Sequence, residues 1–157
     1  MLRNDLLQTL NALMQPENFK DYGPNGLQVE GRETVHTLVS GVTASRALIE
    51  AAIAANACAI LVHHGLFWRG QSGCITGWMK QRLALLLKHD INLLAYHLPL
   101  DAHPTLGNNA QLARLLGLEV QQQLGEQNLL FSGQPALNAP PAALASASAL
   151  AAHVQTT

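Results

Sequence analysis

The chain has 157 residues, enough to bury one hydrophobic core, so we expect one domain, or one domain and the beginning of a second. Hydrophobic residues make up 48% and charged residues 12%, a balance too apolar for a disordered protein. The formal net charge of −1 gives no electrostatic basis for binding nucleic acid or an anionic membrane surface. Small molecules and other protein chains remain as expected partners.

The cysteines and the first residues indicate a cellular compartment. Cys58 and Cys74 are the only cysteines and form no CxxC pair, so we expect two reduced thiols and a cytoplasmic protein. The opening MLRNDLLQTL carries charged and polar residues where a signal peptide needs a continuous apolar stretch. No run approaches the ~20 apolar residues of a membrane helix, so we expect a soluble protein.

The first 31 residues predict one helix and one loop. Leucines at helical spacing predict an amphipathic helix over residues 2–14, which Pro16 ends. The following segment, DYGPNGLQVEG at residues 21–31, is dense in turn-forming residues. We expect it to form a compact loop before any strand begins.

From residue 35 onward, strand patterns and helix patterns alternate. Strands are predicted over residues 35–42, 58–64 and 91–97, and helices over 44–56, 78–90 and 108–117. The first strand is rich in β-forming residues, and the other two are short apolar runs of the kind that is buried on both faces of a sheet. Gly117 suits a helix C-cap because it tolerates a left-handed conformation. This order predicts an α/β fold in which parallel strands are joined by helical crossovers.

The composition changes near residue 120. We expect one short strand within residues 121–134 and an Ala-rich helix over residues 140–157, with Pro141 near its first turn. We therefore divide the chain into an α/β domain over residues 1–120 and a partial, incomplete continuation over residues 121–157.

Two consecutive predicted strands end in histidine, AILVHH at His63 and His64 and NLLAYH at His97. The carboxyl ends of parallel strands meet at one edge of a sheet, and LPLDAH then supplies Asp101 and His103 to the same edge. Pro99 in this segment is expected to keep its start from forming a regular helix. A single histidine at such a position is more often structural than a ligand. Four imidazoles and a carboxylate together favour a divalent metal ion, which could be zinc, manganese, iron or nickel.

The adjacency of His63 and His64 indicates how many ions they serve. Neighbouring residues of an extended strand point to opposite faces, so we expect the two histidines to bind two different ions. A two-metal site also needs a carboxylate that bridges the ions or holds one of them, and Asp101 is the nearest candidate. Even with His97, these residues do not complete two coordination spheres, so further ligands must come from water, a partner chain or missing sequence.

Four segments carry a specific family resemblance: DYGPNGLQVEG, GVTAS, VHHGLFW and HLPLDAHPTLGNNAQLA. In this order and spacing they closely resemble the YbgI-like, Nif-three-like family of dinuclear-metal proteins, many of which are called GTP cyclohydrolase I type 2 homologues. The resemblance implies a mixed, largely parallel sheet and two divalent ions per complete site. It also implies that His63 and His64 serve different ions, that Asp101 is a carboxylate ligand, and that the chains form homohexamers.

The same resemblance implies further ligands in an HxxxE arrangement near the C-terminus of a longer chain. None of the seven histidines here is followed four residues later by glutamate. We therefore expect a C-terminally truncated member with an incomplete centre, a metal-binding protein with a hydrolase-like activity on a small molecule. Two alternatives stay open: a non-catalytic binding or assembly module with structural histidines, and a decayed gene product.

Overall fold

The computed structural model describes residues 1–136, and the chain divides into two compact units, Met1–Pro99 and Leu100–Thr157. Each unit is described by itself, the second as far as Ala136. The division into an α/β domain over residues 1–120 and a partial continuation over residues 121–157 stays a prediction.

The first unit is built on a four-stranded sheet. Its strands, in spatial order, are β1 (Gly26–Val29), β4 (Asn92–Ala95), β3 (Ala59–His64) and β2 (Leu38–Thr43). β2, β3 and β4 run parallel, and β1 runs antiparallel to β4. The mixed, largely parallel sheet expected from the sequence is therefore confirmed.

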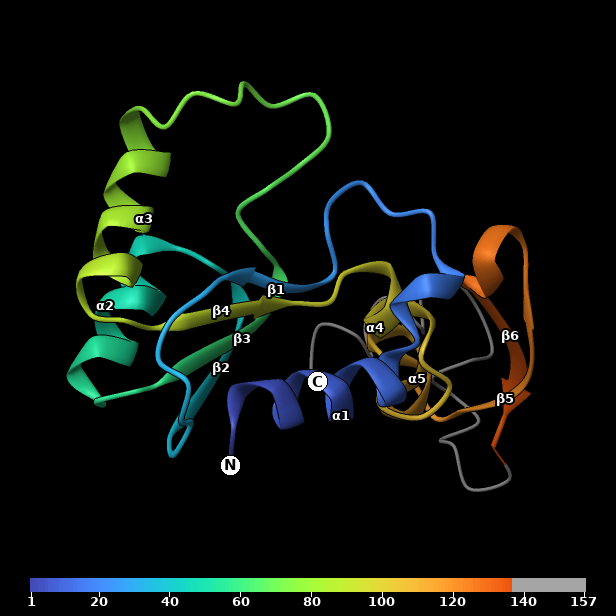
Figure 1. The fold of residues 1–157 in the computed structure, drawn as a ribbon. Helices are drawn as coiled ribbons and strands as arrows, with labels where there is room; N and C mark the ends of the chain where they lie inside the picture. Colours follow the sequence, from blue (N-terminus) through green and yellow to red (C-terminus); the bar gives the residue numbers. More distant parts are fainter. Residues whose placement is uncertain (137–157) are drawn as a thin grey trace. The chain divides into compact units, whose positions relative to one another are not determined.

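Three helices accompany this sheet: α1 (Arg3–Met14), α2 (Arg46–Ala54) and α3 (Gly77–Lys88). α2 joins β2 to β3 and α3 joins β3 to β4, as parallel strands require long crossover connections. Figure 1 shows α2 and α3 together on one side of the sheet. No helix in residues 1–136 is long and apolar enough to cross a membrane.

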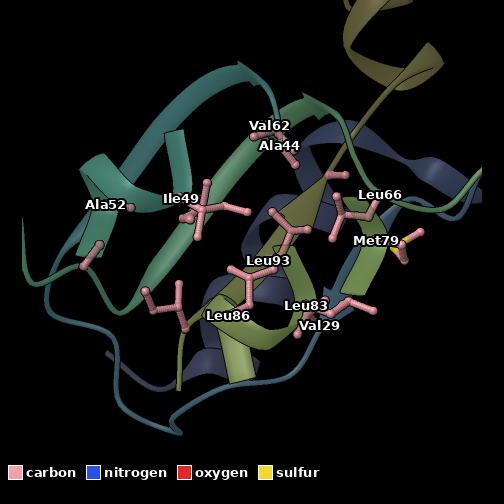
Figure 2. Packing of buried hydrophobic residues seen from close by; sticks show 14 residues of the cluster. Val29, Ala44, Ile49, Ala52, Val62, Leu66, Met79, Leu83, Leu86 and Leu93 are labelled. Atoms are coloured by element: carbon pink, nitrogen blue, oxygen red, sulfur yellow. The ribbon is translucent and has the colours of Figure 1, made fainter. Parts of the chain in front are cut away.

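Alternate residues of the central strands face two separate cores, as the twofold period of a strand dictates. The core under α2 and α3, drawn in Figure 2, includes Ile49, Ile60, Val62, Leu86, Leu93 and Ala95. The core under α1 includes Leu6, Leu10, Ala59, Leu94 and Tyr96. Helices thus cover both faces of the sheet, which explains why the strands are continuously apolar in sequence.

β1 is a strand that forms inside the turn-rich segment from residue 21 to residue 31. It pairs with β4 through Gly26 opposite Ala95 and Leu27 opposite Leu94. Gly26 has a φ of 95°, a conformation that favours glycine at the entry to the strand. Because β1 is antiparallel to β4, its first residue lies at the edge where β4 ends. The loop over residues 21–25 is therefore delivered to the carboxyl edge of the parallel strands.

The second unit contains a helix and a hairpin. After α4 (Leu98–Ala102), its elements are α5 (Asn108–Leu115), β5 (Leu118–Leu124), the short 3₁₀ helix η2 (Glu126–Asn128) and β6 (Leu130–Pro135). β5 and β6 pair antiparallel, so the single short strand expected over residues 121–134 is wrong. The helix predicted over residues 140–157 lies outside the described residues.

Two local predictions in this region have opposite outcomes. Gly117 has a φ of 68° just beyond the last turn of α5, which confirms its role at the helix C-terminus. The expectation that Pro99 prevents a regular helix at its position is wrong, because α4 begins at Leu98. Proline fits the first turn of a helix, where its missing N–H would have no partner within the helix.

Candidate metal centre

Three histidines meet at the carboxyl edge of the sheet. His64 is the last residue of β3, His63 precedes it, and His97 follows β4 by two residues. The ring centroids of His63 and His64 are 4.3 Å apart, and that of His97 lies 4.9 Å from His63 and 5.6 Å from His64. One nitrogen from each ring lies within 4.8 Å of the other two, and all three residues are partly buried. The convergence predicted from the strand ends is therefore present.

The expectation that His63 and His64 point to opposite faces is wrong at this position. β3 pairs with β4 only as far as Val62, so both histidines lie beyond the last pair on that side. His64 still pairs with Thr43 of β2, and the rings of the two histidines approach each other at 4.3 Å. The adjacency of the two histidines consequently does not require a separate ion for each.

The spacing of the three nitrogens fits a divalent ion. Two nitrogen ligands of one tetrahedral zinc ion, each at ~2.0–2.1 Å from the metal, lie about 3.3–3.4 Å apart. The nitrogens here lie within 4.8 Å of one another, so no pair would have to close by more than about 1.5 Å to bind one ion. Neutral imidazole suits zinc, iron and nickel among the expected metals. The His63/His64/His97 cluster could therefore hold a metal ion.

Hydrogen bonds at the rear of His63 and His64 fix how their rings are held. Nδ1 of His63 lies 3.2 Å from the carbonyl oxygen of Tyr96. Because a carbonyl oxygen only accepts, this bond places the proton on Nδ1 and the lone pair on Nε2. Nδ1 of His64 lies 3.1 Å from the hydroxyl of Thr43, which can donate or accept.

His97 is held by a buried carboxylate that the sequence analysis did not single out. Nδ1 of His97 donates to Oδ1 of Asp21 at 2.7 Å, and the Asp21 side chain is only 3% exposed. The same carboxylate accepts from the side-chain amide of Asn25 at 2.9 Å, from the backbone N–H of Leu98 at 2.8 Å and from its neighbour Tyr22 at 2.6 Å. Burial alone would raise the pKa of Asp21, but these hydrogen bonds outweigh it and lower the pKa below its ordinary value.

Hydrogen bonds of Gln28 join the loop before β1 to the loop after β3, beside the Asp21–His97 pair. Gln28 donates through Nε2 to the carbonyl of Pro24 and accepts through Oε1 from the N–H of Leu66, both at 2.8 Å. A Cβ at Gly65 would collide with the Gln28 amide, so a larger residue there would displace the side chain that makes these two hydrogen bonds. The ring of Trp68 lies edge-on to the ring of His97, with the ring centroids 4.9 Å apart and the ring planes at 89° to each other. The two loops thereby enclose one side of the histidine cluster.

The remaining predicted residues lie in the second unit. Asp101 is on α4, and its carboxylate accepts from the side-chain amide of Asn108 at 2.8 Å. His103 accepts through Nδ1 from the backbone N–H groups of Thr105 and Leu106, at 3.3 and 3.1 Å. That arrangement stabilises a local turn. Asp101 stays a predicted metal ligand, whereas His103 has a structural role in its own unit.

The lowered pKa of Asp21 predicts a pH-dependent contribution to stability. Its folded-state pKa lies below the unfolded value, so the stabilisation is complete above the unfolded pKa and is lost as pH falls through the folded pKa. Asp21→Asn should therefore destabilise the fold at about pH 6, and the difference from wild type should shrink toward about pH 3. Urea unfolding across this range measures it. A difference that grows on acidification would contradict the assignment.

A mixed, largely parallel α/β sheet whose strand ends gather three imidazoles defines this chain as an α/β protein with a candidate metal centre. A family profile described as Duf34/NIF3 (NGG1p interacting factor 3) matches residues 1–156. The chain belongs to this family.

Named relatives agree with this membership. The chain is 53% identical over 156 residues to a GTP cyclohydrolase 1 type 2 homolog of Neisseria meningitidis, a match that covers 99% of this chain and 60% of the relative. A protein of the same name from Escherichia coli K12 is 53% identical over 124 residues, covering 79% of this chain and 50% of the relative.

Solved structures give the same result for the fold. The structure of protein ybgI, described as of unknown function, superposes with a TM-score of 0.87 at 48% identity, covering 99% of this chain and 61% of that one. TTHA1606 from Thermus thermophilus gives 0.74 at 43% identity, covering 80% and 52%. The chain thus spans between half and about 60% of the length of these relatives.

Proposed function

We propose that this chain binds one divalent metal ion through His63, His64 and His97, with Asp101 as a further carboxylate ligand. The observation that carries the proposal is the approach of three imidazole nitrogens to within 4.8 Å of one another at the carboxyl edge of the sheet. This edge is where α/β proteins assemble their binding sites. Asp101 follows His97 by four residues in the sequence, and the family resemblance supports its role.

The number of donors favours one ion over two. Three histidines and one aspartate supply four protein ligands, the number of one tetrahedral coordination sphere. The three imidazole nitrogens lie within 4.8 Å of one another, close enough to surround one ion. We therefore propose a single ion at the His63/His64/His97 cluster.

The activity that fits such a centre is hydrolysis of a small molecule. A bound divalent ion would polarise a substrate carbonyl or phosphoryl group and activate water. The chain's own residues would orient the three imidazoles from behind, through Tyr96, Thr43 and Asp21. Trp68 would shield one side of the cluster.

Thermal unfolding in the presence of metal tests the proposal. A ligand at 100 times its Kd stabilises the folded state by ~2.7 kcal/mol, which raises Tm by roughly 5–11 °C for a chain of this size. We expect Zn²⁺ or Mn²⁺ to raise the Tm of metal-free protein, and a chelator to reverse the change. A Tm that responds to neither ion would favour the alternative in which the histidines are structural.

A further inference from the structure

We propose that Asp21 is a positioning residue for the metal centre, holding the imidazole of His97 in the tautomer and orientation that present Nε2 to the ion. The inference rests on the proposed function, because it assumes that His97 is a ligand. Asp21 belongs to the segment DYGPNG at residues 21–26. Neither the fold nor the histidine cluster alone explains the role of this segment.

The first step concerns the proton of His97. The two oxygens of Asp21 accept four hydrogen bonds, and an ionised carboxylate accepts hydrogen bonds and donates none. The 2.7 Å bond between Nδ1 and Oδ1 therefore requires the proton on Nδ1. In the neutral ring the lone pair is then on Nε2, the nitrogen remote from Asp21.

The second step concerns the orientation of the carboxylate itself. Each oxygen of Asp21 accepts two hydrogen bonds: Oδ1 from His97 and the N–H of Tyr22, and Oδ2 from Asn25 and the N–H of Leu98. Asn25 also accepts through Oδ1 from the backbone N–H of His97 at 2.8 Å. One loop thus fixes both the backbone and the ring of His97, while Trp68 contacts the ring edge-on.

The third step concerns charge. Neutral imidazoles bring no charge to a cation, whereas Asp21 brings one negative charge to the rear of His97, with its side chain only 3% exposed. A carboxylate bound to the second nitrogen of a ligating histidine raises the basicity of the first, and its loss typically weakens metal binding by roughly 10- to 100-fold. Asp21 has the position and the charge for this role.

Metal titration of Asp21→Asn tests the inference. Both oxygens face hydrogen-bond donors, so an amide must turn its NH₂ group toward a donor, either His97 or the Leu98 side. We expect Zn²⁺ affinity, measured by competition with a chelating dye, to fall by roughly 10- to 100-fold. The matched control Asp5→Asn makes the same charge change on the exposed face of α1 and should leave the affinity within about twofold. Equal affinities for Asp21→Asn and wild type would overturn the inference.

A double-mutant cycle separates positioning from general stabilisation. If Asp21 acts through His97, adding Asp21→Asn to His97→Gln should cause no further loss of Zn²⁺ affinity. A second loss as large as the first would show that Asp21 acts by another route, and would overturn the inference.

The tautomer of His97 in metal-free wild-type protein gives a readout that requires no variant to fold. Two-bond ¹H–¹⁵N correlation spectra should show the proton on Nδ1 of His97. A proton on Nε2 would overturn the inference even if Zn²⁺ binds. If wild type fails to bind Zn²⁺ while the proton is on Nδ1, the proposed function fails and the Asp21–His97 pairing stands.

Discussion

Replacing His63 and His64 together by alanine is expected to abolish measurable Zn²⁺ binding. The two residues supply two of the three imidazole nitrogens that lie within 4.8 Å of one another, which leaves only His97 and the proposed ligand Asp101. Loss of a partner behind a ligand costs roughly 10- to 100-fold in affinity, and loss of two direct ligands should cost more. Isothermal titration of the metal-free double variant measures the effect.

The matched control for this experiment is His36→Ala. His36 is exposed and precedes β2, at the end of that strand opposite to Thr43, which contacts His64. The substitution removes an imidazole that lies outside the cluster, so the Zn²⁺ affinity of the variant should equal that of wild type. A double variant that retains wild-type affinity would place the metal elsewhere in the chain.

Replacing Leu86 by alanine is expected to give a large loss of stability. Leu86 is 0% exposed, on α3, and packs with Leu83, Leu93 and Ile49 in the core between the helices and the sheet (Figure 2). Truncating a fully buried leucine removes its transfer free energy and leaves a cavity, at a cost of about 2–5 kcal/mol. Urea unfolding of metal-free protein should show this as a lower midpoint.

The neighbouring residue on the same helix provides the comparison. Leu87 is 63% exposed, so Leu87→Ala makes the same chemical change outside the core. Its effect should stay within about 0.5 kcal/mol. Similar losses for the two variants would mean that α3 does not pack on the sheet through Leu86.

The parallel part of the fold could be predicted because its signals are local. The apolar runs ending in His64 and His97 have the composition of buried strands, and the intervening residues have helical spacing. β1 lacked such a signal, since it has four residues and exists through its pairing with β4 almost 70 residues later. The β5–β6 hairpin was underestimated because mostly polar residues such as Gln122 and Gln123 gave only a weak strand pattern.

The histidine cluster was predictable for a geometric reason. Parallel strands place their carboxyl ends together, so His63, His64 and His97 had to approach one another whatever the details of the crossovers. The relative direction of His63 and His64 was not predictable from the alternation of a regular strand. The two rings approach each other at 4.3 Å at the end of β3, an arrangement that the alternation pattern does not contain.

Asp21 was missed because its partner lies 76 residues away in the sequence. Turn-forming neighbours such as Gly23 and Pro24 predict a loop. The residues around Asp21 carry no signal that this loop lies at the end of β4. The antiparallel direction of β1 brings it there. A carboxylate in a turn-rich segment that precedes a strand is the signal that a search for partners of His97 could have used.

The metal content of the reconstituted, dialysed protein tests the central claim most directly. Elemental analysis after loading with Zn²⁺ or Mn²⁺ should find one ion per wild-type chain and none in the His63→Ala/His64→Ala double variant. An ion retained by the double variant, no ion in wild type, or two tightly held ions per chain would contradict a single metal centre at the His63/His64/His97 cluster.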